Sequence, residues 1–195
     1  MITFGGLPTK LKRGLMLYSR YSLPAADFSS EPPMPAILFV CTANRIRSPL
    51  AEHLLRRRLA KEMTTASWRV ESAGAWAESD LPALPAARQA GAELGVDLSD
   101  HRSRHVDDLH LNHYDLILTM ERGQRDILRM EHPEVAERIM TMSEATTGYD
   151  YDIADPPGHT SAAVRSTARD LDDLINRGAN RLVRAISSGL SAGLG

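Results

Sequence analysis

Hydrophobic and polar positions follow two patterns along this chain, one typical of buried strands and one typical of amphipathic helices. Short apolar runs without polar interruptions predict strands that are buried on both faces. Longer stretches with apolar residues three or four positions apart predict helices with one buried face. Strands are predicted at residues 36–40, 68–71, 115–120 and 138–142. Helices are predicted at residues 49–59, 86–94, 106–111, 122–130 and 162–186.

The order of these elements predicts the fold class. Strands and helices alternate, which is typical of an α/β domain with a parallel sheet and helices on both of its faces. We therefore expect a single domain over residues 34–188, built on a four-stranded parallel sheet. The second strand is expected to close in a turn at Ser72, Ala73 and Gly74. In such sheets, ligands bind at the carboxyl ends of the strands.

The two ends of the chain lack this periodicity. Residues 1–33 carry several prolines and a serine-rich stretch, without the long apolar region and cleavage site of a signal peptide. We expect this extension to be disordered, or translation to start at Met34. Residues 189–195 are expected to form a flexible tail.

Composition and charge narrow the possible environments and partners. The chain has 195 residues, of which 43% are hydrophobic and 25% charged, as in a soluble protein with one full-sized core. A net charge of −2 gives no electrostatic case for binding nucleic acid or an anionic membrane. A single cysteine excludes an intrachain disulfide and fits a reducing cytoplasm. No apolar run is long enough to span a bilayer.

The only cysteine stands at the carboxyl end of the first predicted strand. Cys41 opens the segment Cys-Thr-Ala-Asn-Arg-Ile-Arg-Ser-Pro, which leads directly into a predicted helix. The backbone N–H groups of such a loop and the positive end of the helix dipole attract a phosphate-like dianion. Arg47 adds a planar fork of donors that matches two phosphate oxygens. The same positive field favours the thiolate form of Cys41, which is the nucleophilic form.

The residues that follow Arg47 fit a helix start. Ser48 is expected to cap the helix and to donate a hydrogen bond to the thiolate, with Pro49 as the first helical residue. The alternative is a buried structural cysteine in a strand-to-helix turn, since free cysteines are often buried. That alternative leaves Asn44, Arg47 and Ser48 without an explanation.

This motif resembles the phosphate loop of the low-molecular-weight protein tyrosine phosphatase family. The family's loop begins with the nucleophilic cysteine, has asparagine three residues later, and ends in arginine-serine-proline. The family also carries an Asp-Pro pair far downstream, matched here by Asp155 and Pro156. Segments 71–74 and 114–120 are similar to the family as well. The resemblance extends from about residue 34 to about residue 186.

The resemblance implies a mechanism and a set of site residues. Cys41 attacks phosphorus, Asp155 protonates the leaving oxygen, and Asp155 then acts as base for the water that hydrolyses the phosphocysteine. The expected catalytic residues are thus Cys41, Arg47 and Asp155, and no metal or cofactor is required. The expected substrate is a protein carrying phosphotyrosine or a related phosphomonoester. Its phosphate is expected to be bound by Thr42, Ala43, Asn44, Arg45, Ile46 and Ser48, together with Arg47. From local sequence alone, Asp155-Pro156 also fits an ordinary turn.

Four residues match family positions that brace the loop: Asn44, Ser48, Ser72 and His101. Asparagine also tolerates a left-handed backbone, so Asn44 has an alternative role in shaping the loop. The alternatives for Ser72 and His101 are a turn at a strand end and a solvated residue beside a helix. The histidine pairs 101/105 and 110/113 have spacings compatible with zinc, but no cysteine or carboxylate completes a ligand set.

Two residues of the loop depart from the family. Many members have a second cysteine where this chain has Ile46, so oxidised Cys41 has no neighbouring thiol to rescue it. Arg45 replaces an apolar or small residue, which is a threonine in relatives that act on phosphoarginine. A cation at this position disfavours a cationic substrate and favours an acidic peptide or a second phosphate. The alternative is that Arg45 points to solvent.

The surroundings of the Asp-Pro pair depart from the family too. Typical members place aromatic residues there, where this chain has Pro157 and Gly158. Trp76, Tyr149 or Tyr151 are the candidates for an aromatic wall of the cleft.

Three functions are compatible with the motif. The first is a cytoplasmic phosphatase for phosphotyrosine or a related phosphoester. The second is a phosphate- or phosphoprotein-binding module that binds vanadate without hydrolysis. The third is an arsenate reductase that uses external thiols and consumes them in the presence of arsenate.

Overall fold

The computed structural model describes residues 34–61 and 68–187. The expectations for residues 1–33 and 189–195 lie outside the described residues. Within this part of the chain, four parallel strands form one sheet in the order β2-β1-β3-β4. The strands are β1 (Ala36–Cys41), β2 (Arg69–Gly74), β3 (Leu116–Thr119) and β4 (Ile139–Thr141). The predicted fold class, an α/β fold on a four-stranded parallel sheet, is confirmed.

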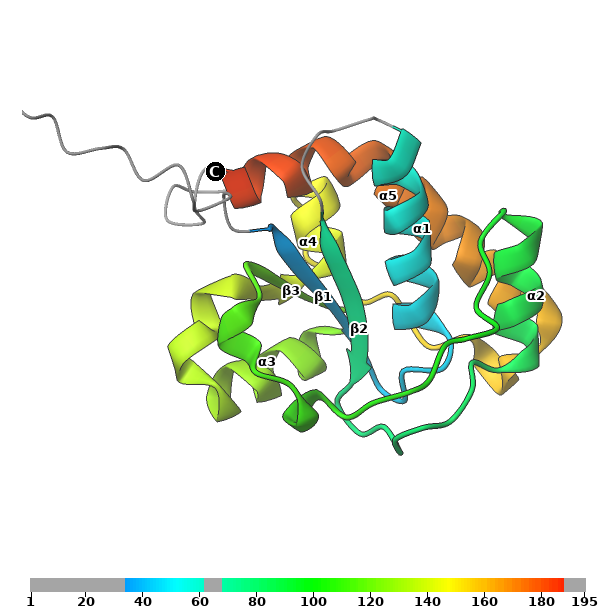
Figure 1. The fold of residues 1–195 in the computed structure, drawn as a ribbon, viewed down its shortest axis with the longest axis horizontal. Coiled ribbons are helices and arrows are strands. Elements are labelled where there is room, and N and C mark those ends of the chain that lie inside the picture. The colour runs from blue at the N-terminus through cyan, green and yellow to red at the C-terminus, as the bar shows by residue number, and fades with distance from the viewer. Residues whose placement is uncertain (1–33, 62–67, 188–195) are drawn as a thin grey trace, which may run out of the picture. The chain divides into compact units, whose positions relative to one another are not determined.

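Helices cover both faces of this sheet (Figure 1). One face carries α1 (Arg47–Lys61), α2 (Pro85–Glu93), α4 (Met142–Thr147) and the long α5 (Ser161–Ser187). The other face carries α3 (Arg122–Glu131) and three short 3₁₀ turns at Val106–Asp108, Leu111–His113 and Pro133–Arg138.

The apolar run in β1 is continuous because this central strand is buried on both faces of the sheet. All six residues of β1 are buried, and their side chains alternate between two apolar cores. Ile37, Phe39 and Cys41 belong to the core under α1 and α5. Leu38 and Val40 belong to the core under α3. The thiol of Cys41 therefore emerges at the end of β1 on the face where α1 begins.

Two boundaries differ from the predictions in the region that carries the loop. β2 continues through Gly74, so Ser72 and Ala73 are strand residues and not a closing turn. The cause is pairing with β1, which extends to Cys41 opposite Gly74. α1 begins at Arg47, so Ser48 lies inside the first turn and is not the N-cap.

Two predicted helical segments also differ. The helix predicted at residues 106–111 is two separate 3₁₀ turns, because Leu109 and Tyr114 each end a turn in an extended backbone conformation. α4 was not predicted, since its six residues are too few to show a helical repeat. Its N-cap is Thr141, whose side chain accepts a hydrogen bond from the N–H of Glu144, and its C-cap is Gly148, with a positive φ of 84°.

Candidate active site

The loop between β1 and α1 places Cys41 at the bottom of a small pocket. Cys41 is 3% exposed, and its Sγ lies 3.0 Å from Oγ of Ser48. The Ser48 hydroxyl has one proton and lies 3.1 Å from the carbonyl oxygen of Ala73, which can only accept. Ser48 can thus donate to Ala73 while the thiol is protonated, and to the sulfur once the thiolate forms. The predicted hydrogen-bonding partner of Cys41 is in place, although Ser48 does not cap the helix.

Asn44 shapes the loop by both its backbone and its side chain. Its φ is 54°, in the left-handed region, and its side chain is completely buried. Its Nδ2 donates to Oγ of Ser48 and of Ser72, each at 2.9 Å. Its Oδ1 accepts from the N–H of Arg104 at 3.1 Å, and its carbonyl oxygen accepts from Nε2 of His101 at 2.7 Å. The two roles considered for Asn44 are therefore combined in one residue.

Ser72 and His101 are buried against the loop rather than solvated. Ser72 is 2% exposed and His101 is 9% exposed. Ser72 donates to a carboxylate oxygen of Glu52 at 2.5 Å, and Glu52 is paired with Arg56 on the next turn of α1. Burial lowers the pKa of His101, and the hydrogen bond to the Asn44 carbonyl opposes this effect. Glu52 was not among the residues predicted from the sequence.

The Arg47 side chain is 1% exposed and has contacts with three different segments. Nη1 donates to Glu121 and, at 2.9 Å, to the carbonyl oxygen of Ile153. Nη2 donates to Oγ1 of Thr42 at 3.1 Å and pairs with Oδ1 of Asp155 at 2.8 Å. Nε is buried and has no hydrogen-bond partner among the described residues. The edge formed by Nε and Nη2 is thus available to an anion that displaces Asp155.

Glu121 orients this guanidinium from the end of β3. It is the N-cap of α3 and forms a capping box with Gln124. Nε2 of Gln124 also donates to Oγ1 of Thr42 at 3.2 Å. Neither residue was predicted as part of the site. The available signal was an acidic residue directly after a buried strand, with Gln three positions later at a helix start.

Asp155 reaches the pocket from the long connection between α4 and α5. The N–H of Ile153 donates to the carbonyl oxygen of Met120 at 2.8 Å, and Asp152 accepts from the N–H and Nε of Arg122 at 2.8 and 3.0 Å. These contacts hold the connection against the carboxyl ends of the strands. Asp155 itself is 48% exposed on its side chain. The residue predicted as the acid therefore lines the same pocket as Cys41, although the two are far apart in the chain.

The resulting pocket has a volume of about 180 Å³. Its lining residues are Cys41, Thr42, Ala43, Arg45, Ile46, Arg47, Leu84, Asp155 and His159. Arg45 lines this pocket, and its Nε donates to the carbonyl oxygen of Pro82 at 2.9 Å in a solvent-exposed hydrogen bond. Leu84 and Ile46 supply apolar surface. Leu84 and His159 were not predicted as site residues.

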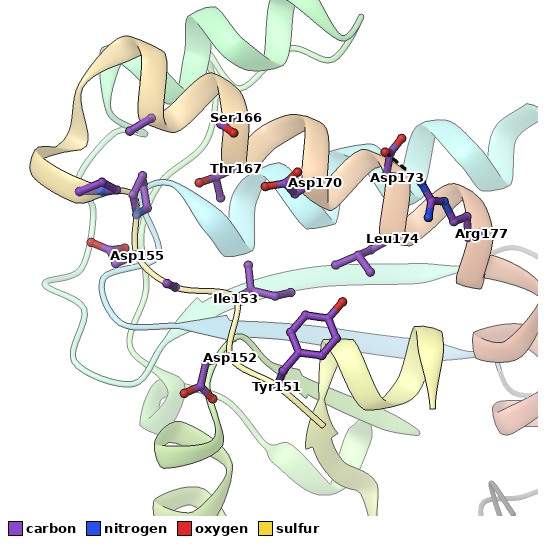
Figure 2. Close-up of a pocket in the computed structure, with 14 residues that line it drawn as sticks. Tyr151, Asp152, Ile153, Asp155, Ser166, Thr167, Asp170, Asp173, Leu174 and Arg177 are labelled. Atoms are coloured by element: carbon purple, nitrogen blue, oxygen red, sulfur yellow. Dashed lines mark hydrogen bonds and ion pairs between the residues drawn. The ribbon is translucent and has the colours of Figure 1, made fainter. Parts of the chain in front are cut away.

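The three candidate aromatic residues lie in different places. The N–H of Trp76 donates to the carbonyl oxygen of Thr42 at 3.0 Å, and its side chain is 55% exposed beside the loop. Tyr149 is 75% exposed. Tyr151 lines a separate hollow of about 630 Å³ between residues 151–157 and α5 (Figure 2). Tyr151 therefore does not line the pocket of Cys41.

Asp155 lines both the pocket of Cys41 and the larger hollow, where Figure 2 labels it. Thr167 and Asp170 approach this larger hollow from α5, while Ile153 and Leu174 contribute apolar surface.

Over residues 34–61 and 68–187, no group of three His, Cys, Asp or Glu side chains is arranged to hold a metal ion. Within the same ranges, no helix is both long and apolar enough to cross a membrane.

Comparison with known proteins identifies chains that are similar to this one over most of its length. The family profile described as low molecular weight phosphotyrosine protein phosphatase matches residues 36–191. A protein-arginine-phosphatase from Geobacillus stearothermophilus is 33% identical over 75% of this chain and 95% of its own length. The low molecular weight protein-tyrosine-phosphatase Wzb from Escherichia coli (strain K12) is 32% identical over 78% of this chain and 95% of its own length.

The fold is similar to that of solved structures as well. The crystal structure of a low molecular weight protein tyrosine phosphatase from T. tengcongensis has a TM-score of 0.70 and 33% identity, and the match covers 76% of this chain and 99% of that chain.

Proposed function

This chain belongs to the low molecular weight phosphotyrosine protein phosphatase family, and we propose that it hydrolyses phosphomonoesters on proteins through a phosphocysteine at Cys41. The observation that carries this proposal is the buried guanidinium of Arg47 beside the thiol. Its Nε has no partner among the described residues, and burying an unpaired charged donor is costly. A phosphate bound by Nε and Nη2 would satisfy it.

The first chemical step is transfer of the phosphoryl group to sulfur. The incoming phosphate replaces Asp155 on the Arg47 edge, and its remaining oxygens meet the N–H groups of the loop. The Cys41 thiolate forms the S–P bond as the ester P–O bond breaks. Asp155 gives its proton to the leaving oxygen, so a neutral alcohol or phenol departs. Ser48 stabilises the thiolate that must persist before attack.

The second step reverses the role of Asp155. The carboxylate takes a proton from water while that water attacks phosphorus. The S–P bond breaks, inorganic phosphate leaves, and the thiolate is restored with Asp155 protonated again. Arg47 is held at Nη1 by Glu121 and the Ile153 carbonyl, so its phosphate-binding edge keeps its orientation through both steps.

Within this reaction class, we propose phosphotyrosine and not phosphoarginine as the substrate. The relatives named above include both a protein-arginine-phosphatase and a protein-tyrosine-phosphatase, so family membership leaves both chemistries open. The proposal is supported by Arg45, which lines the pocket and donates a hydrogen bond to the carbonyl oxygen of Pro82. A second guanidinium on the substrate would be repelled there, whereas an aromatic ring would pack on Ile46 and Leu84.

The first experiment measures hydrolysis of para-nitrophenyl phosphate from pH 4 to 8, with a chelator present, for the wild type, Cys41→Ser and Asp155→Asn. Cys41→Ser is expected to abolish turnover, and Asp155→Asn to lower kcat by about 10²–10⁴-fold. Activity that survives in Cys41→Ser would refute the phosphocysteine. Binding of vanadate without any turnover would instead favour the binding module, and arsenate-dependent consumption of thiols would favour the reductase.

The substrate preference is tested with one peptide sequence carrying either phosphotyrosine or phosphoarginine. The wild type is expected to prefer phosphotyrosine, and Arg45→Thr is expected to raise kcat/KM for the phosphoarginine peptide selectively. An unchanged ratio between the two peptides in Arg45→Thr would contradict the role assigned to Arg45.

A further inference from the structure

His159 has no role in the mechanism above, yet it contacts the residue proposed as the general acid. Its Nε2 lies 2.7 Å from Oδ2 of Asp155. The other oxygen of the same carboxylate, Oδ1, faces Nη2 of Arg47 at 2.8 Å. The two oxygens of Asp155 are therefore held by different partners, one on the outer side of the pocket and one on the inner side.

We propose that His159 is a positioning residue that holds Oδ2 of Asp155, so that Oδ1 carries the proton that is given to the leaving group. This inference rests on the proposed function, since it assigns a role relative to Asp155 as acid.

The backbone around His159 supports a built contact. Gly158 and His159 have φ values of 60° and 50°, two left-handed residues in succession. A left-handed conformation is unfavourable for a non-glycine residue such as histidine and persists only where other contacts maintain it. This tight turn brings the imidazole of His159 close to the carboxylate of Asp155, four residues earlier. His159 also lines the pocket of Cys41, so the contact is made at the site itself.

The hydrogen bond from His159 determines which oxygen of Asp155 carries the proton. While Asp155 is ionised, the hydrogen bond must run from the Nε2–H of His159 to Oδ2, because a carboxylate only accepts. When Asp155 is protonated with this bond in place, its proton resides on Oδ1. That oxygen faces the inner side of the pocket, where a phosphate on Arg47 would place the leaving oxygen.

The His159 contact matters most after substrate has bound. A phosphate on the Nε–Nη2 edge of Arg47 removes the partner of Oδ1, and Asp155 is half exposed and otherwise free to rotate. The bond to His159 survives this exchange because it uses the other oxygen. His159 keeps its own proton throughout, while Oδ1 gives a proton to the leaving oxygen and later regains one from water.

The test compares leaving groups that need a proton to different degrees. Phenyl phosphate releases a basic phenolate and depends on the acid, whereas para-nitrophenyl phosphate releases a stabilised phenolate and depends on it less. His159→Ala is expected to lower kcat/KM, which reports the transfer of the phosphoryl group to sulfur, about tenfold for phenyl phosphate, the effect of one hydrogen bond, and less for para-nitrophenyl phosphate. His159→Gln, which keeps a donor near the position of Nε2, is expected to recover most of the loss. His110→Ala serves as the control, because His110 is exposed and its side chain caps nothing.

A double-mutant cycle with Asp155→Asn separates positioning from a general structural effect. In the Asp155→Asn background, His159→Ala is expected to cause no further loss of kcat/KM, because the acid is already absent. An equal loss for both phosphate esters, or the same loss in both backgrounds, would overturn the inference. Turnover that falls with Asp155→Asn but not with His159→Ala overturns the role of His159 and leaves the phosphatase intact. Absence of turnover in the wild type overturns both.

Discussion

Gly74→Ala tests the claim that β2 supports the phosphate loop directly. Gly74 ends β2 opposite Cys41, and its φ is not in the left-handed region, so space and not backbone freedom decides whether a side chain is tolerated. A Cβ at this position would lie 2.6 Å from the carbonyl oxygen of Thr42, 2.8 Å from Cβ of Ala77 and 2.9 Å from the backbone N of Asn44.

The size of the effect follows from these distances. An unstrained contact between carbon and oxygen is about 3.3 Å, so the loop must move by about 0.7 Å. Two of the three obstructing atoms belong to the backbone of the loop, which cannot turn aside as a side chain can. A misplacement of about 1 Å costs roughly 10²-fold in rate, so we expect kcat/KM to fall by about 10–100-fold. Overpacking is expected to cost about 1–3 kcal/mol in the free energy of unfolding.

The assay combines kcat/KM for para-nitrophenyl phosphate with the inhibition constant of inorganic phosphate and with urea unfolding. Gly123→Ala is the matched control, because a Cβ on Gly123 in α3 meets nothing within 4 Å. The control is expected to keep full activity and to gain up to about 1 kcal/mol in stability from helix propensity. A Gly74→Ala protein with the phosphate affinity and kcat/KM of the wild type would refute the reasoning.

Two further predictions concern stability. Because burial lowers the pKa of His101, the unfolded chain binds a proton on this residue more readily than the folded chain, so the free energy of unfolding should fall as the pH drops below about 6.5. The melting temperature of His101→Gln should therefore decline less steeply than that of the wild type between pH 7.5 and 5, and parallel declines would argue against this role of His101. Gly178→Ala places a Cβ 2.7 Å from Cα of Thr146, so α5 must shift away from α4. We expect the free energy of unfolding, measured in urea, to fall by about 1–3 kcal/mol, and an unchanged urea midpoint would show that the two helices separate without cost.

Local patterns in the sequence were sufficient to predict the central strand and the loop that follows it. The apolar run of β1 predicts a strand buried on both faces, and the spacing of Cys41, Arg47 and Ser48 predicts an anion-binding loop at its end. These are local signals, since a strand, a loop and the first turn of a helix are continuous in the chain. Asp155 was placed beside this loop only through resemblance to a family, because an Asp-Pro pair alone is an ordinary turn.

The contacts made across the chain were decided by the tertiary structure. From local sequence Ser72 looked like part of a turn, and only the family resemblance predicted that it braces the loop; the extension of β2 alongside β1 places its hydroxyl on Asn44. Arg45 has its hydrogen-bond partner, the carbonyl oxygen of Pro82, in a segment that no sequence pattern connects to the loop. In each case the partner lies at least 28 positions away in the chain.

The same reason explains the residues that were not predicted. Glu121 holds Arg47 across 74 positions of sequence, and no spacing rule connects them. His159 contacts Asp155, which is only four positions away, yet the contact depends on two successive left-handed residues that no simple sequence pattern predicts. Periodicity records which face of an element is buried, whereas the partner of a buried polar group is known only when separate elements have packed together.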